Sequence, residues 1–318
     1  MSVESRLSEP HGELAGRASE CSASDIPSSP NRRGARVGHC DGYRPSESLG
    51  KTILPGDIYA VMAGDVPPSL RAFFAEADAP NRSLALVNRK EPEAVQRLLE
   101  SAFAGQSVSV AERQFPEEGD DVVLVIEDTD VVATSPLDEV MNAFLLVNSD
   151  LYKTGTSGLE DGGAPSVLTA LADVVFDLRG YPASNKEKLL LILMSRYIER
   201  LALSSGGGRL RSTFQRLSRI EDERGTREVY RKLAESGVDV HVYGQPGWRP
   251  DESLDLTVHT GTSDDYRHSW CVAYTPQGGD GTYAALVAVE TAPNEWRGMW
   301  TYDRDRVTRV DRYLDERL

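Results

Sequence analysis

Arginines gathered in one stretch of the second half are the side chains best suited to chemistry in this sequence. The segment 209–232 holds eight basic and four acidic residues, in a chain whose formal net charge is −15. Because the guanidinium fork binds carboxylates and phosphates through paired hydrogen bonds, this excess predicts a site for an anionic ligand or an acidic partner surface. Ion pairs within the segment are the alternative, and the sequence leaves both open.

Two short alternating segments decide which of these side chains can meet. Alternation predicts strands over 209–215 and 238–244, each with its polar side chains mainly on one face. If the strands are neighbours, arginine forks and a histidine that changes charge near neutral pH line one surface. The candidate ligand-binding residues on these strands are Arg209, Arg211, Gln215, His241 and Tyr243. We expect the two arginines to be exposed, so that replacing both costs little stability.

Tryptophans close together near the end of the chain form a second group. Trp270, Trp296 and Trp300 fall on predicted strands, with tyrosines nearby. Aromatic side chains on adjacent strands normally pack in the core, and tryptophan is highly buried on average. Aromatic side chains also wall pockets for flat or apolar ligands, so Trp270 and Trp300 join the ligand-binding candidates.

Catalytic and metal-binding patterns are not evident in the sequence. His241, His259 and His268 fall on or beside three successive strands, but a three-histidine metal site needs rings that converge and partners that orient them. Cys271 lies inside an apolar strand, where cysteine behaves as a small hydrophobic residue. The glycines at 206–208 follow a helix, whereas a dinucleotide-binding glycine loop opens one. We therefore expect no catalytic residue and no metal, and the sequence identifies no cofactor.

The composition is acidic and poor in lysine. Only six of the 35 basic residues are lysines; this is typical of proteins from salt-loving archaea, whose hydrated carboxylate surfaces keep them soluble in concentrated salt. An acidic protein from a GC-rich bacterium is the alternative. No apolar run reaches the roughly 18 residues of a membrane span, and residues 1–30 lack a signal-peptide core. We expect a cytoplasmic protein without membrane contact.

Changes in composition divide the chain into segments. Residues 1–60 are rich in Ser, Gly, Arg and Pro and predict a disordered tail. Residues 67–150 and 165–318 each alternate helices with strands and continue with hairpins, and a Gly/Ser/Thr-rich linker over 151–164 joins them. This order predicts an α/β fold of the mixed α+β kind, in which mixed β-sheets carry helices packed against them and the two α/β halves are similar.

Capping residues mark the ends of the predicted helices. One helix opens at Ser184 or Asn185 and ends at the glycines 206–208, where glycine can take the left-handed conformation. A second helix has Thr226 as its N-cap, and the last helix has Asp303 as its N-cap. The first two helices alternate with the two arginine- and histidine-bearing strands and therefore position them.

Five motifs in a fixed order resemble the DICT sensory domain, a family named for its occurrence in diguanylate cyclases and two-component systems. The motifs are SRYIER at 195–200, FQRLS at 214–218, VYRKL at 229–233, DVHVYG at 239–244 and MWTYD at 299–303. They cover about residues 185–303, and the chain from about residue 69 is similar to stand-alone haloarchaeal members. The segment 165–318 is thereby identified as a DICT-like sensory domain.

The resemblance implies signal input, with a link to light or redox responses. No kinase, cyclase or receiver sequence accompanies it, so the signal has to reach a separate output protein. We expect a non-enzymatic cytoplasmic sensory protein that binds a small ligand or a signalling partner, and a homodimer is left open. The alternative is a DNA-associated transcriptional regulator, although the acidic net charge makes nucleic-acid binding unfavourable.

Overall fold

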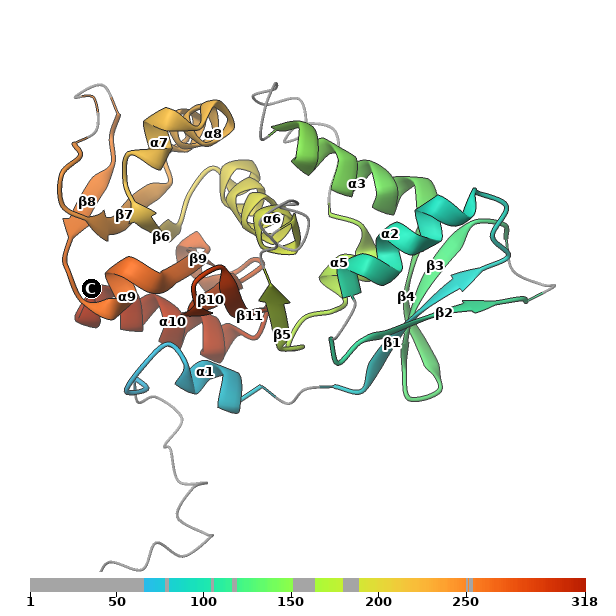
Figure 1. Cartoon of the computed structure of the whole chain (residues 1–318). Helices are drawn as coiled ribbons and strands as arrows, with labels where there is room; N and C mark the ends of the chain where they lie inside the picture. The colour runs from blue at the N-terminus through green and yellow to red at the C-terminus, as the bar shows by residue number, and fades with distance from the viewer. Residues whose placement is uncertain are drawn as a thin grey trace, which may run out of the picture. The chain divides into compact units, whose positions relative to one another are not determined.

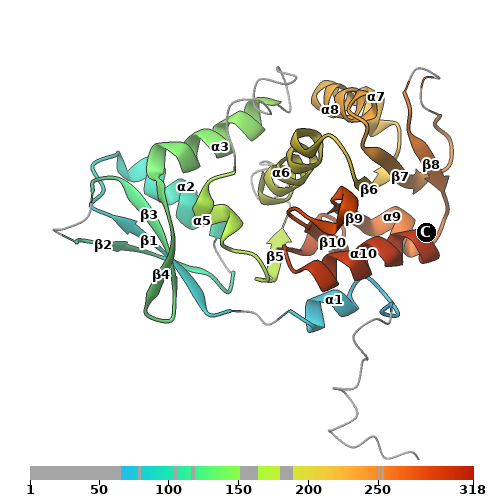
Figure 2. The ribbon, with the colours of Figure 1, turned by 180° about the vertical axis from the view of Figure 1, so that it is seen from behind.

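A computed structural model gives the fold, and it describes residues 66–77, 80–103, 106–115, 119–150, 164–179, 189–249, 251 and 254–318. Figure 1 shows the ribbon, and Figure 2 shows it from behind. The predicted tail over 1–60, nearly all of the predicted linker and the predicted helix start at Ser184 or Asn185 lie outside the described residues.

The first half builds a four-stranded sheet in the order β2-β1-β3-β4. Strands β1 and β2 are parallel because helix α2 carries the chain back between them, whereas β3 and β4 are antiparallel neighbours joined by a tight turn. The elements are α1 Ala72–Ala75, β1 Arg82–Val87, α2 Glu93–Phe103, β2 Ser109–Arg113, β3 Val122–Glu127, β4 Asp130–Pro136 and α3 Leu137–Asp150.

The second half builds a seven-stranded sheet in the order β5-β11-β10-β9-β6-β7-β8. Its elements are α5 Ser166–Thr169, β5 Phe176–Arg179, α6 Leu189–Ser205, β6 Arg209–Arg216, α7 Arg219–Asp222, α8 Arg224–Glu235, β7 Asp239–Gln245, β8 Thr257–Thr260, α9 Asp264–His268, β9 Ser269–Thr275, η1 Gln277–Gly279, β10 Ala284–Ala292, β11 Glu295–Thr301 and α10 Arg304–Arg317.

The two sheets share one pattern of strands. In the first sheet a parallel pair, β1 and β2, is followed by β3 antiparallel to β1 and by β4 antiparallel to β3. In the second sheet β6 and β7 form the parallel pair, followed by β9 antiparallel to β6 and by β10 antiparallel to β9. The predicted fold, with mixed sheets and two similar α/β halves, is confirmed.

Helices cover both faces of the seven-stranded sheet, since its strands are buried on both sides. Alternate residues such as Leu210 and Val240 pack with α6 and α8 in a large apolar cluster. The alternating residues on the other face of the strands, such as Tyr243, pack with α9 and α10 in a second cluster. Figures 1 and 2 show α6 and α8 on one side of this sheet and α9 and α10 on the other.

Specific contacts join the two halves of the chain. Arg82 of β1 donates through Nη1 to the carbonyl oxygens of Ala170 and Ala172, at 2.6 and 2.7 Å. The side-chain amide of Gln106 donates to the backbone oxygen of Asp177 at 2.7 Å and accepts from its backbone nitrogen at 2.9 Å. Because Asp177 lies in β5, at the edge of the sheet among the described strands, Gln106 satisfies backbone groups that face none of those strands.

The predicted helix ends were partly right. Gly206 and Gly208 have φ values of 64° and 91°, so the left-handed stop after α6 is confirmed. The Asp303 cap is also confirmed, because its carboxylate accepts from the backbone nitrogen of Arg306 at 2.8 Å. The Thr226 cap is wrong: α8 begins at Arg224, and the Thr226 hydroxyl lies between Arg196 and Glu223.

Candidate functional site

Strands β6 and β7 are parallel neighbours, as the candidate site required. Their register places Arg209 beside Asp239, and Arg211 beside His241. These side chains share the face of the sheet that α10 covers. The predicted adjacency of arginine and histidine is therefore confirmed, but a helix lies over the surface that was expected to face solvent.

Arg211 is the centre of a network of hydrogen bonds under α10. Its Nε donates to Asp311 Oδ1 at 2.9 Å, its Nη2 donates to Asp315 Oδ1 at 2.6 Å, and its Nη1 donates to the Tyr243 hydroxyl. Arg209 binds both oxygens of the Asp311 carboxylate, at 3.0 and 2.5 Å. Two strand arginines are thus fastened to two carboxylates of the C-terminal helix.

The expectation that both arginines are exposed and cheap to remove is wrong for Arg211. Its side chain is only 3% exposed, because α10 packs over the neighbouring strand β9 and its carboxylates reach the side chain of Arg211. The Arg209 side chain is 40% exposed and lies at the rim. Removing Arg211 would leave Asp311 buried with one partner fewer, which costs far more than breaking a surface pair.

Two histidines extend the network to the edge of the sheet. His241 Nδ1 lies 2.9 Å from His259 Nε2, and His241 Nε2 lies 3.1 Å from Asp239 Oδ2. The His259 ring stacks on Tyr243 with centroids 4.3 Å apart and planes 8° from parallel. The network, which we name the Arg–His cluster, consists of Arg209, Arg211, Asp239, His241, Tyr243, His259, Asp311 and Asp315.

Burial shifts the acid–base behaviour of two members of the cluster. The pKa of His259 is lowered by desolvation first, and further by His241 and Arg211. Burial also raises the pKa of the Tyr243 hydroxyl to about 12, although Arg211 acts in the opposite direction. At neutral pH, Tyr243 is therefore a neutral hydroxyl that accepts from Arg211.

The other predicted ligand-binding residues lie elsewhere. Gln215 is near the end of β6, where its backbone oxygen accepts from Gln245 Nε2. Trp270 and Trp300 face the opposite side of the sheet, toward the cluster that contains α6 and α8. Trp270 donates to Ser195 Oγ at 2.9 Å. Of the seven candidates, the structure brings together Arg209, Arg211, His241 and Tyr243.

The three-histidine alternative does not form. His268 binds Glu290 at 3.0 Å and does not take part in the contact between His241 and His259. Throughout the described part of the chain, no group of three or more His, Cys, Asp or Glu side chains is arranged to hold a metal ion.

Sequence reasoning missed the two carboxylates that complete the cluster. Asp311 and Asp315 are four residues apart and so lie on one side of α10, next to its buried residues Val310 and Leu314. An acidic pair beside an apolar helix face is a detectable signal, but it does not identify the arginines that it binds. His259 was considered only as part of the three-histidine alternative.

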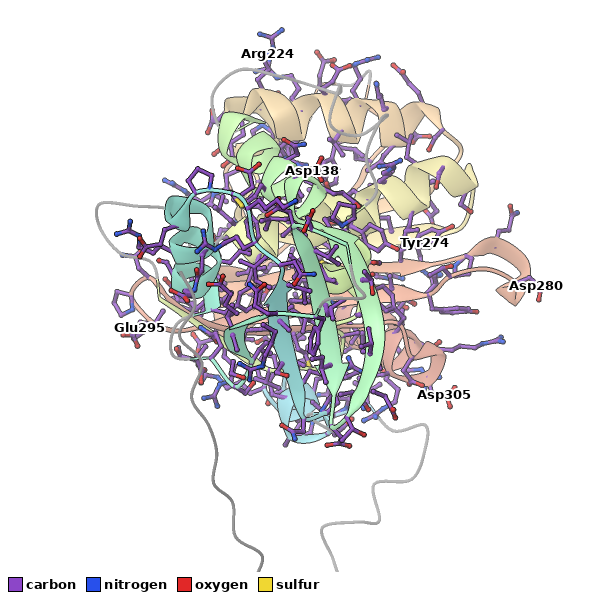
Figure 3. All side chains as sticks on the ribbon, turned by 90° about the vertical axis from the view of Figure 1, so that its right-hand side faces the viewer. Asp138, Arg224, Tyr274, Asp280, Glu295 and Asp305 are labelled. Atoms are coloured by element: carbon purple, nitrogen blue, oxygen red, sulfur yellow. The ribbon has the colours of Figure 1, made fainter. Side chains whose placement is uncertain are left out.

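Ion pairs account for part of the basic segment. Arg231 binds Glu228 at 2.6 Å and Glu235 at 2.7 Å, both on α8. Arg224, at the start of α8, is exposed and points away from the fold in Figure 3. The alternative of local ion pairs is thus confirmed for Arg231.

Cys271 should resist alkylation in the folded chain. It is fully buried in β9, and burial raises the pKa of its thiol to about 12. At about pH 8 the thiolate is therefore on the order of one ten-thousandth of the thiol. We expect iodoacetamide to leave Cys271 unmodified until guanidinium is added, as measured by peptide mass spectrometry. Rapid labelling of the folded chain would contradict this burial.

Comparison with known proteins identifies the segment that holds most of the cluster. Residues 165–291 match the family model of DICT, described as "Sensory domain in DIguanylate Cyclases and Two-component system". The resemblance found from the motifs is confirmed over this segment, while the motif at 299–303 and the whole of α10 lie beyond it.

The other comparisons add little. A search of curated proteins finds no match. A solved structure with detectable likeness is the polyphosphate kinase from Porphyromonas gingivalis, at 19% identity and a TM-score of 0.30. The match covers 48% of this chain and 25% of that enzyme, so the chain spans a quarter of its length. A likeness this low carries no inference about activity. Among the described helices, none is long and apolar enough to cross a membrane.

Proposed function

Starting from a DICT sensory domain at residues 165–291, we propose that the chain is a non-enzymatic cytoplasmic signal-input protein. In this proposal it binds a small ligand or a signalling partner and passes the signal to a separate output protein. The sensory role follows from the family, and the proposal adds the mode of action.

One observation carries the proposal. The Arg–His cluster joins strands inside the family segment to α10, which lies beyond the segment, through the hydrogen bonds of Arg209 and Arg211 to Asp311. A change in the position of β6 or β7 would therefore alter the hydrogen bonds that hold the C-terminal helix. In this proposal the contact has two discrete arrangements, and a bound ligand or partner favours one of them.

The cluster also limits which kinds of ligand can bind at this site. Its two guanidinium groups already face three carboxylates, those of Asp239, Asp311 and Asp315. A free anion would have to compete with these internal partners, so the cluster is poorly suited to bind a simple phosphate or carboxylate. We infer that the input acts on the partly exposed rim around Arg209 and alters the contact with α10.

A matched pair of arginine variants tests this function. Arg209→Gln should lose at least about nine-tenths of the ligand or partner that co-purifies with the tagged chain from its host, as measured by native mass spectrometry. Arg297→Gln should retain it. Both arginines bind one carboxylate through Nε and Nη2, and their exposed fractions of 40% and 47% are similar.

Thermal melts provide the control for folding. Arg297→Gln should cost on the order of 0–1 kcal/mol, because its partner Asp177 is exposed, whereas Arg209→Gln should cost about 1–3 kcal/mol, because it removes one of the two partners of the buried Asp311. Retention of the bound species by Arg209→Gln would contradict the proposed site. Specific binding of DNA in a gel shift would favour the transcriptional regulator instead.

A further inference from the structure

We propose that acid releases the edge strand β8 from the sheet. The contact between His241 and His259 tolerates one added proton, whereas a second proton separates β8 from β7. The inference rests on the proposed sensory function, and it names acidification as the signal that is sensed. The release itself is a property of the isolated chain, so it is tested without any ligand or output partner.

Counting hydrogens at the histidine contact shows why one proton is tolerated and two are not. With both rings neutral, His241 Nε2–H donates to Asp239 and His259 Nε2–H donates to His241 Nδ1. One added proton leaves a single hydrogen between the rings. A second proton puts hydrogens on both facing nitrogens, which lie 2.9 Å apart, so the bond is lost and two positive charges meet.

Charged groups of three elements surround this pair. Asp239 of β7 lies 3.1 Å from His241 Nε2, and Arg211 of β6 opposes a charge on His259. Asp315 of α10 partly offsets Arg211. On α9, Asp265 is engaged by the hydroxyl of Tyr313. A positive charge on His259 is therefore resisted by both Arg211 and His241.

The sign of the pH dependence follows from the partly buried ring of His259. Its pKa is lowered in the folded chain by burial, by His241 and by Arg211. The unfolded or released strand then binds the proton more tightly than the paired strand does. The stabilisation of β8 is fully present above about pH 6.5, the ordinary value for histidine, and is lost as the pH falls through the lowered pKa.

The place of His259 in the sheet explains why β8 is the element that responds. β8 is four residues long, Thr257–Thr260, and pairs with β7 alone among the described strands. A short edge strand has few interactions to lose and opens at low cost. Its release takes the His259 ring off Tyr243, whose hydroxyl binds Arg211. The response would thereby reach the arginine that holds α10.

Hydrogen exchange of the purified full chain at fixed KCl tests the inference. Between about pH 8 and about pH 5, the protection of β8 amides, corrected for the intrinsic exchange rate, should fall by at least about tenfold. Protection in the central strand β10 should stay the same. His259→Gln should abolish the fall, because the amide can hydrogen-bond His241 but takes up no proton at these pH values.

His268→Gln is the matched control, since His268 lies outside the cluster and binds Glu290. It should retain the full fall in protection. If His259→Gln does not fold by circular dichroism, His241→Gln provides the second variant and should make the fall smaller, because it removes the second positive charge. Unchanged β8 protection in the wild type, or an equal fall in the glutamine variants of the pair, would overturn the inference.

Discussion

Replacing Asp311 by alanine should lower the free energy of unfolding by about 3–5 kcal/mol, because breaking a buried ion pair strands a charge without its partner. Asp311 is buried and receives hydrogen bonds from both Arg209 and Arg211. Without it, the guanidinium of Arg211 keeps Asp315 and Tyr243 but loses its most buried partner. Urea unfolding at constant KCl measures the change.

Asp315→Ala is the control for this prediction. Asp315 also binds Arg211, but its side chain is 57% exposed, so we expect a loss of only about 0–1 kcal/mol. The comparison removes one carboxylate from the same arginine and the same helix in both cases. Similar losses for the two variants would mean that the burial of Asp311 does not determine its contribution.

Trp300→Ala should cost about 3–5 kcal/mol, the range for truncating a buried aromatic residue. Trp300 is 1% exposed and stacks on Phe176 with ring centroids 5.0 Å apart and planes 6° from parallel. Its removal would leave a cavity beside Phe176 in the large apolar cluster on one face of the sheet. Thermal melts and urea unfolding measure the loss.

Trp270→Phe is the companion variant, because it keeps an aromatic ring while removing part of the ring surface and the N–H that donates to Ser195. We expect a loss of about 1 kcal/mol. The pair also decides between a core and a pocket wall for Trp300. If Trp300→Ala abolished retention of a co-purified ligand while leaving stability intact, the core role would be wrong.

Local patterns sufficed to predict the strands of the candidate site. Alternation in β6 and β7 separates polar from apolar faces, so the two strands, if they are neighbours, present their polar side chains on one surface. That reasoning placed Arg211 near His241, as the register confirms. It also placed Cys271 in an apolar strand, where it is fully buried.

Long-range packing could not be predicted in the same way. Asp311 lies 102 residues from Arg209 along the chain, and no local pattern indicates that the carboxylates of α10 reach the arginines of β6. The predicted exposure of Arg211 was therefore wrong, because alternation indicates which face of the strand a side chain lies on but not which element covers that face. The N-cap at Thr226 failed for a related reason: its hydroxyl serves a contact with α6 through Arg196.

The amide of Gln106 gives the seven-stranded sheet two unlike ends. At β5 the Gln106 amide forms hydrogen bonds with the backbone N–H and C=O of Asp177, as a neighbouring strand would. At the other edge, β8 has no strand beyond it among the described residues. A fibre that grows by strand addition needs two free, complementary ends on every subunit. Among the described strands of this sheet, β8 is therefore the edge that is more open to strand addition, and joining two β8 edges produces a closed twofold pair that does not grow further by this route.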